Sequence, residues 1–103
     1  MVVLTTAPDA DVARSLATRV VEERLAACAN VVPGVTSIYR WEGAVQEDSE
    51  VLVILKTTPA GYGHLRDRIA ELHPYEVPEI LVLDTPEGSA DYMRWVADEV
   101  SAP

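Results

Sequence analysis

The sequence has little of three features that would each indicate a particular class of protein. Its single cysteine, Cys28, cannot form an internal disulfide, which fits a reducing compartment and excludes a disulfide scaffold. No stretch approaches the roughly 18 consecutive apolar residues of a membrane-spanning helix, and the N-terminus lacks the basic and apolar segments of a secretory signal. We therefore expect a cytoplasmic protein without a membrane partner.

Basic side chains are also scarce. Seventeen acidic against eight basic side chains give a formal net charge of −9 at pH 7. A charge of this sign repels phosphate backbones and anionic lipid surfaces at long range. Nucleic acid is therefore not expected as a partner.

Hydrophobic residues, in contrast, are plentiful. They make up 49% of the 103 residues, which is enough for one buried core at the usual size of one domain. The sequence shows no internal repeat, low-complexity tract or linker, because apolar periodicity resumes within a few residues of every turn signal. Residues 1–103 are therefore predicted to form a single domain.

The first half of the chain predicts a strand, a helix and the start of a hairpin. Val2 to Thr6 is a short β-branched run typical of a buried strand. Asp9 is a candidate N-cap, and apolar residues every four positions predict an amphipathic helix that runs to about Ala27. A strand pattern then begins at Cys28, and Pro33-Gly34 interrupts it, so we expect a kink or bulge there.

The predicted hairpin is too long for the domain that carries it. Alternation continues to Trp41, and a turn around Gly43 leads into a second strand from Val45 to Thr58. Such a strand, of about 14 residues at about 3.3 Å each, spans roughly 46 Å, more than the roughly 30 Å diameter of a small domain. Because isolated two-stranded ribbons are marginal in water, the excess length predicts self-association.

The second half predicts a helix, a strand and a last helix. A second amphipathic helix begins at Tyr62 and ends at His73-Pro74, because a residue before proline disfavours helical torsions. Glu79 to Asp84 reads as a strand, and Ser89 as the cap of a final helix. The order βαββαβα predicts an α+β, ferredoxin-like βαββαβ sandwich with an extra C-terminal helix.

Three separated segments carry a resemblance to a known family. Val3 to Pro8, Leu25 to Gly43 and His73 to Glu79 resemble the CutA divalent-cation-tolerance proteins. The resemblance runs from Val2 to about Trp95.

The resemblance implies both an assembly and a function. Members of the family form trimers of ferredoxin-like subunits whose long hairpins reach their neighbours, and they resemble the PII signalling proteins in architecture. The family is associated with tolerance to copper and other divalent cations, and no enzymatic activity is firmly attached to it. We therefore expect a homotrimer that responds to a metal ion and is not an enzyme.

The sequence departs from the family at two positions that bear on copper. Some members carry a cysteine where this chain has Thr5 and a histidine where it has Leu72, and these have been discussed as ligands together with the carboxylate that matches Glu79. Thiolate and imidazole groups select copper, whereas a lone carboxylate has little selectivity. The departures weaken the case for copper relative to other divalent cations.

His73 is the best single candidate for a metal ligand. It lies where a helix ends in a Pro-rich loop, with Glu76 and Glu79 close in sequence. Imidazole and carboxylates together would suit zinc or copper. The alternative is that His73 caps the preceding helix by donating to its last carbonyl groups. His64 reads as a solvated surface residue.

Cys28 follows a helix directly, so its default role is that of a small buried hydrophobe. As a thiol it is also a candidate metal ligand. A nucleophilic role would need a base within hydrogen-bond reach, and only His73 or His64 could serve.

Tyr39, Trp41 and Tyr75 are large amphipathic side chains of the kind that fill subunit interfaces. The alternative is that they line an inter-subunit cleft with Lys56 and Glu76, where a small ligand or an anion could bind. Lys56 closes an otherwise apolar strand, so we expect its charge to meet a carboxylate or a ligand.

The acidic residues at the hairpin tip are a weaker candidate. Oxygen ligands suit calcium or magnesium, but strand alternation puts Asp48 and Glu50 on one side and Glu47 on the other. We therefore interpret them as a solvated face.

These observations leave three functions open. The first is a trimeric metal-responsive protein that holds copper or another divalent cation at a subunit junction through His73 and Glu79. The second is a PII-like sensor of a small ligand that uses Trp41, Lys56 and Tyr75. The third is a trimeric scaffold without small-molecule chemistry.

Overall fold

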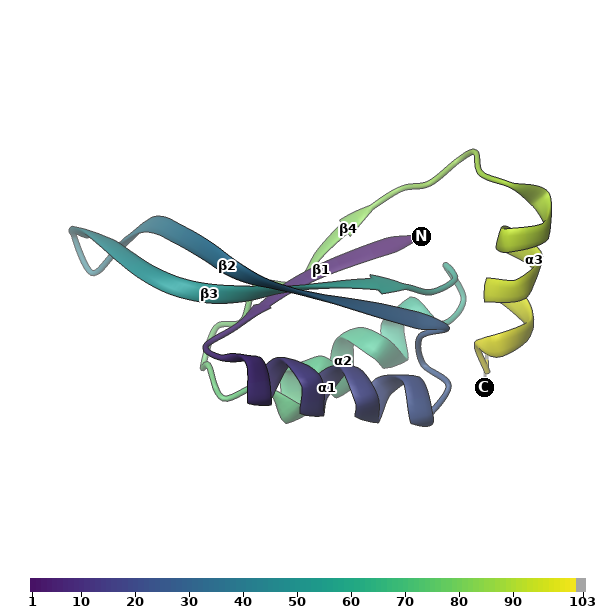
Figure 1. Ribbon diagram of the computed structural model, residues 1–103, viewed down its shortest axis with the longest axis horizontal. Coiled ribbons are helices and arrows are strands. Elements are labelled where there is room, and N and C mark those ends of the chain that lie inside the picture. Colours follow the sequence, from purple (N-terminus) through teal and green to yellow (C-terminus); the bar gives the residue numbers. More distant parts are fainter. Residues whose placement is uncertain (102–103) are drawn as a thin grey trace.

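The computed structural model describes residues 1–101. Its elements are β1 (Val2–Ala7), α1 (Ala10–Glu22), β2 (Cys28–Trp41), β3 (Ala44–Lys56), α2 (Tyr62–Leu72), β4 (Leu81–Leu83) and α3 (Ala90–Glu99). The strands pair antiparallel in the order β2-β3-β1-β4. The predicted element order and the α+β fold are confirmed (Figure 1).

One face of the sheet is covered by helices and the other is not. α1 and α2 lie together on one side of the strands (Figure 1). On that side Val3 pairs with Leu55, both are fully buried, and Leu65 and Ile69 of α2 complete the core. On the opposite side Leu4 pairs with Ile54, and both stay partly exposed, so an apolar sheet surface has no helix over it.

α1 is shorter than the sequence pattern suggested. It ends at Glu22 rather than near Ala27, because Arg24 takes a left-handed conformation with φ of 62°. The N–H groups of Arg24 and Leu25 donate to the carbonyl groups of Val21 and Val20, which is the Schellman pattern of a helix end. Arginine gives no signal for this conformation, so the sequence did not reveal the stop.

The same Arg24 side chain holds the last helix in place. Its guanidinium donates to the backbone carbonyl groups of Asp98 at 2.8 Å and Glu99 at 3.1 Å. α3 begins after the predicted cap Ser89, whose hydroxyl accepts from the backbone N–H of Tyr92. Figure 1 places α3 at the end of the molecule opposite the hairpin tip.

The hairpin of β2 and β3 extends beyond the helices (Figure 1). Its pairing register shifts between Val32 and Val35, so the bulge predicted at Pro33-Gly34 is confirmed. At the tip Glu42 and Gly43 have φ of 50° and 80°, the positive pair that a two-residue type I′ turn requires. The molecule measures 44 × 25 × 21 Å, and the long axis confirms the predicted excess length.

Two strand boundaries differ from the prediction. β4 has three residues, Leu81–Leu83, where Glu79 to Asp84 was expected, because it pairs only with Val2 to Leu4 of β1. β3 ends at Lys56, two residues before the predicted Thr58. The shorter β4 leaves Glu79 in the loop after α2, where it faces a pocket rather than a strand partner.

Candidate functional site

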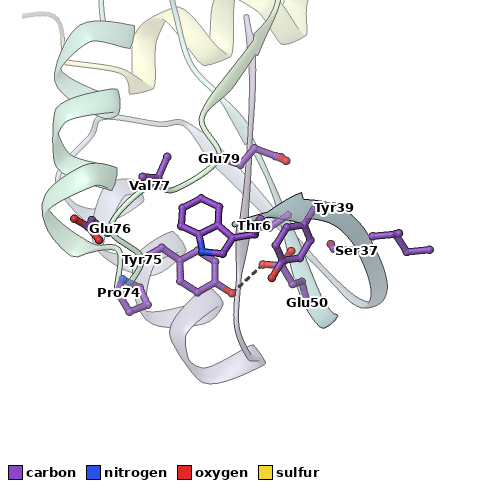
Figure 2. Close-up of a pocket in the computed structure, with 11 residues that line it drawn as sticks. Thr6, Ser37, Tyr39, Glu50, Pro74, Tyr75, Glu76, Val77 and Glu79 are labelled. Carbon is purple, nitrogen blue, oxygen red and sulfur yellow. Dashed lines mark hydrogen bonds between the residues drawn. The ribbon is translucent and has the colours of Figure 1, made fainter. Parts of the chain in front are cut away.

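A pocket lies between the hairpin and the loop that follows α2. Its volume is about 620 Å³. We call it the hairpin pocket, and it is lined by Thr6, Ser37, Ile38, Tyr39, Trp41, Glu50, Pro74, Tyr75, Glu76, Val77 and Glu79 (Figure 2). Strand alternation explains why Ser37, Tyr39 and Trp41 lie together, because side chains two residues apart share one face of β2.

His73 fixes the loop that forms the other wall of the pocket. The side chain is 7% exposed. Its Nε2 lies 2.6 Å from the carbonyl oxygen of Thr6, and its Nδ1 accepts from the backbone N–H of Tyr75 at 3.1 Å. One nitrogen faces an acceptor and the other a donor, so the imidazole is the neutral form that carries its proton on Nε2. Both nitrogens are therefore occupied.

The alternative role considered for His73 was that it caps the C-terminal end of α2, and the structure shows which of its groups does so. Its backbone N–H, not its side chain, donates to the carbonyl group of Ile69 at 2.9 Å and ends α2. The side chain instead ties the loop to β1. A metal ion could reach His73 only by replacing one of its two hydrogen bonds.

Two phenols donate to carboxylates along the hairpin. The Tyr75 hydroxyl donates to Glu50 at 2.9 Å, as Figure 2 shows, and the Tyr39 hydroxyl donates to Asp48. Burial, reinforced by the hydrogen bond to Glu50, raises the pKa of Tyr75 to about 12. The hydrogen bond to Asp48 raises the pKa of Tyr39. Both phenols therefore stay protonated at neutral pH and act as donors.

These bonds refine the prediction for the acidic hairpin residues. Asp48 and Glu50 lie on one side of β3, as strand alternation predicted, and each is bound by a tyrosine rather than simply solvated. No group of three or more His, Cys, Asp or Glu side chains forms around them within residues 1–101.

The hairpin pocket is acidic. Glu50, Glu76 and Glu79 line it, and no lysine, arginine or histidine does so. Figure 2 shows the three glutamates on different sides of the pocket rather than pointing at one centre. Within residues 1–101 no three His, Cys, Asp or Glu side chains lie close enough to hold a metal ion.

Lys56 and Cys28 do not line the hairpin pocket of their own subunit. Cys28 pairs with Lys56 across the hairpin, and Lys56 in turn pairs with Val2. Thr6, which reaches the pocket, lies four residues farther along β1, or about 13 Å at the rise of a strand. Within one subunit Lys56 therefore does not join Trp41 and Tyr75, and the predicted inter-subunit cleft would need a second subunit to bring them together.

The surroundings of Lys56 also differ from the expectation. Its ammonium donates to the side-chain oxygen of Asn30 and lies 3.8 Å from the sulfur of Cys28. Its partner is thus an amide and a thiol, not a carboxylate. Cys28 is half-buried and does not join His73 or Glu79 in one subunit, so a ligand set of these three could form only between subunits.

Sequence reasoning missed several residues of the pocket wall. Thr6 is the last residue but one of β1, and Ser37 precedes Tyr39 by two positions on the same strand face. The alternation of β2 could have indicated Ser37, whereas Thr6 and Val77 enter through tertiary packing that no local pattern encodes.

The sequence matches a known family over nearly its whole length. The sequence model of the CutA1 divalent ion tolerance protein family matches residues 1–99. The chain belongs to this family. The predicted CutA resemblance is thus confirmed.

Individual CutA relatives support the assignment. The chain is 53% identical over 97 residues to the divalent-cation tolerance protein CutA of Thermus thermophilus, covering 94% of each chain. It is 48% identical over 96 residues to the protein of that name from Salmonella newport, covering 93% of this chain and 84% of the relative. Both relatives are named for divalent-cation tolerance.

Solved CutA structures have the same fold. The structure of the Thermus thermophilus protein superposes with a TM-score of 0.95 at 51% identity, and 97% of each chain is covered. CutA1 from Oryza sativa superposes at 0.96 with 37% identity, covering 99% of this chain and 94% of the other. One CutA relative, from Archaeoglobus fulgidus, is named periplasmic (TM-score 0.93, 30% identity, 97% of each chain).

The compartment of this CutA family member stays a prediction. In the part of the chain that the structure describes, no helix has the length and apolar character needed to cross a bilayer.

Proposed function

We propose that this protein acts in divalent-cation tolerance as a homotrimer that holds a divalent cation at its subunit junctions, with carboxylates of the hairpin pocket as ligands. The observation that supports the proposal is the lining of the pocket, which contains three glutamates and no basic side chain. Carboxylate oxygens suit hard and borderline divalent cations.

The surface of the subunit supports self-association. The sheet face opposite the helices carries Leu4, Leu52, Ile54 and Leu81, which no helix covers. Contiguous exposed apolar surface of this kind marks interaction sites. β2 and β4 are the edge strands of the sheet, and their unpaired backbone groups favour pairing with another chain.

The number of ligands explains why a junction is needed. No three potential ligands converge within one subunit in residues 1–101. One subunit would supply one or two carboxylates, and a neighbour or retained water would supply the rest. Glu79 is our first choice, because it lies in the pocket and matches the carboxylate discussed for the family.

The donor chemistry bears on which cation is preferred. The pocket offers carboxylate and phenol oxygens, whereas Cys28 lies at the other end of the hairpin and both His73 nitrogens are occupied. We therefore expect zinc(II) and copper(II) to bind weakly through oxygen, and copper(I), which needs soft ligands, not to bind in the pocket.

The proposal is tested by calorimetric titration of tag-free protein with zinc(II), copper(II) and copper(I). Glu79→Gln keeps the shape of the side chain and removes its charge. Glu22→Gln is the matched control, because Glu22 is an exposed carboxylate at the end of α1, outside the pocket. Cys28→Ala and His73→Ala test the ligands predicted from the sequence.

Saturable binding of zinc(II) at a fixed ratio per trimer, lost in Glu79→Gln and kept in Glu22→Gln, is the expected result. Binding that survives Glu79→Gln but is lost in Cys28→Ala would move the site away from the pocket. Absence of binding tighter than about 0.1 mM, or roughly −5.5 kcal/mol, would contradict a metal site.

The assembly is tested separately by light scattering coupled to size exclusion. The expected mass is three times the 11.2 kDa of the chain. A monomer at micromolar concentration would contradict the trimer.

A further inference from the structure

The hairpin pocket combines aromatic rings with negative charge and has no positive charge in its lining. Tyr39, Trp41 and Tyr75 line it, and all three are among the exposed large hydrophobic side chains of the chain. We propose that this pocket binds an organic cation, namely an alkylamine or a quaternary ammonium compound. The inference goes beyond the proposed metal function and does not rest on it.

Two of the three aromatic rings, those of Tyr75 and Tyr39, are held in place before any ligand arrives. The Tyr75 ring packs against His73 with 4.7 Å between ring centroids, and its hydroxyl is fixed by Glu50. The Tyr39 hydroxyl is bound to Asp48. Ring faces attract ammonium groups within about 6 Å, and fixed rings lose less entropy on binding.

The arrangement of charge favours an organic cation over an anion, and over a metal ion held by one subunit alone. An anion would meet three glutamates and no basic side chain, because Lys56 lies at the other end of the hairpin. A single small ion needs ligands that converge, and these do not within one subunit over residues 1–101. A cation with an organic body can contact rings on one side and reach separate carboxylates on others.

The size and apolar content of the pocket fit such a ligand. About 620 Å³ lies within the roughly 300–1,000 Å³ range of small-molecule sites. Ile38, Pro74 and Val77 add apolar wall to the rings. Methyl or methylene groups attached to the ammonium nitrogen would be buried against this wall.

The inference changes the small-ligand alternative that the sequence left open. That alternative joined Lys56 to the aromatic residues and so allowed an anionic ligand. With Lys56 beside Asn30 instead, the pocket keeps its rings and loses the only cation assigned to it. The ligand that we expect is therefore positively rather than negatively charged.

Choline is a suitable probe, and 3,3-dimethylbutan-1-ol is its neutral counterpart of nearly the same shape. We would titrate the trimer with each by calorimetry in the presence of EDTA, so that divalent metal ions play no part. The expected result is saturable binding of one choline per subunit, at least about tenfold tighter than the neutral alcohol. Binding should weaken with added salt, since carboxylates contribute.

Variants locate the binding. Trp41→Leu removes a ring and keeps an apolar side chain, and Glu79→Gln removes one charge at an exposed position. Each should weaken choline binding by about tenfold or more, which corresponds to about 1.4 kcal/mol. Trp95→Leu is the matched control, because Trp95 is the other exposed tryptophan and lies on α3, outside the pocket.

Three results would each overturn the inference. The first is no choline binding up to about 10 mM, which corresponds to about −2.7 kcal/mol. The second is equal affinity for choline and the neutral alcohol, and the third is full choline affinity in both Trp41→Leu and Glu79→Gln. The outcomes also separate the two proposals. Choline binding in EDTA without any zinc(II) binding would contradict the metal site alone, and zinc(II) binding without choline binding would contradict the organic-cation site alone.

Discussion

The two ends of the β2–β3 hairpin differ in charge and in cover. At the base Lys56 and Cys28 lie side by side, and α3 sits at this end of the molecule (Figure 1). Toward the tip, aromatic residues and glutamates line the hairpin pocket (Figure 2). The base of the hairpin therefore packs against the rest of the domain, whereas the half nearer the tip carries accessible polar side chains. We assign the function to the half nearer the tip.

The largest expected effect concerns packing at the base. Leu55 is fully buried, whereas Val45 near the tip is 66% exposed. Leu55→Ala should lower the free energy of unfolding by about 2–5 kcal/mol, because it leaves a cavity in the core. Val45→Ala should change it by less than about 0.5 kcal/mol. Denaturant unfolding at one protein concentration measures both.

Equal losses of unfolding free energy in Leu55→Ala and Val45→Ala would contradict this difference between the two ends. They would show that the tip is packed as tightly as the base in the assembled protein. Concentration must be fixed because dissociation of an oligomer contributes to its apparent stability.

The next effect concerns the loop that carries the pocket wall. His73→Leu removes the partner of the Thr6 carbonyl group and of the Tyr75 N–H group at a buried position. Leaving such groups unpaired costs about 1–3 kcal/mol. We expect faster amide hydrogen exchange at Tyr75, Glu76, Val77 and Glu79 and unchanged exchange at α3. An equal increase in the exchange rate in this loop and in α3 would contradict a local role for His73.

A smaller effect concerns the phenol of Tyr75. Its pKa is raised to about 12 in the folded protein, above the ordinary value of 10, so the unfolded state loses the proton first as the pH rises. The stability that this phenol contributes is fully present below pH 10 and is lost as the pH rises toward 12. A spectrophotometric titration should show a tyrosine that ionises near pH 12, and this ionisation should be missing in Tyr75→Phe.

Tyr62→Phe is the control for that titration, because Tyr62 lies at the start of α2 and outside the pocket. Retention of the late ionisation in Tyr75→Phe would contradict the assignment to Tyr75.

Much of the fold could be predicted because its signals are local. Pro33-Gly34 marked the bulge, His73-Pro74 marked the end of α2, and Ser89 marked the start of α3. The end of α1 could not be predicted, because it depends on a left-handed Arg24 whose side chain is anchored to the distant carbonyl groups of Asp98 and Glu99.

The site was predicted less completely than the fold. The aromatic residues and Glu76 and Glu79 were singled out, and the structure brings them into one pocket. Lys56 and Cys28 lie at the other end of the hairpin, because the register of β3 against β1 and β2 decides which end of the hairpin a residue occupies. That register is a tertiary property, and apolar alternation alone does not fix it.

The central claim is that cations bind at the pocket end of the hairpin and not at the base. The most direct test is a zinc(II) titration followed by backbone amide chemical shifts of the labelled protein. We predict shifts at Ser37, Tyr39 and Trp41 and at the non-proline residues of the loop from 75 to 79, with residues near Lys56 and in α3 unchanged. Shifts centred on Cys28 and Lys56, with the pocket residues unchanged, would contradict the account.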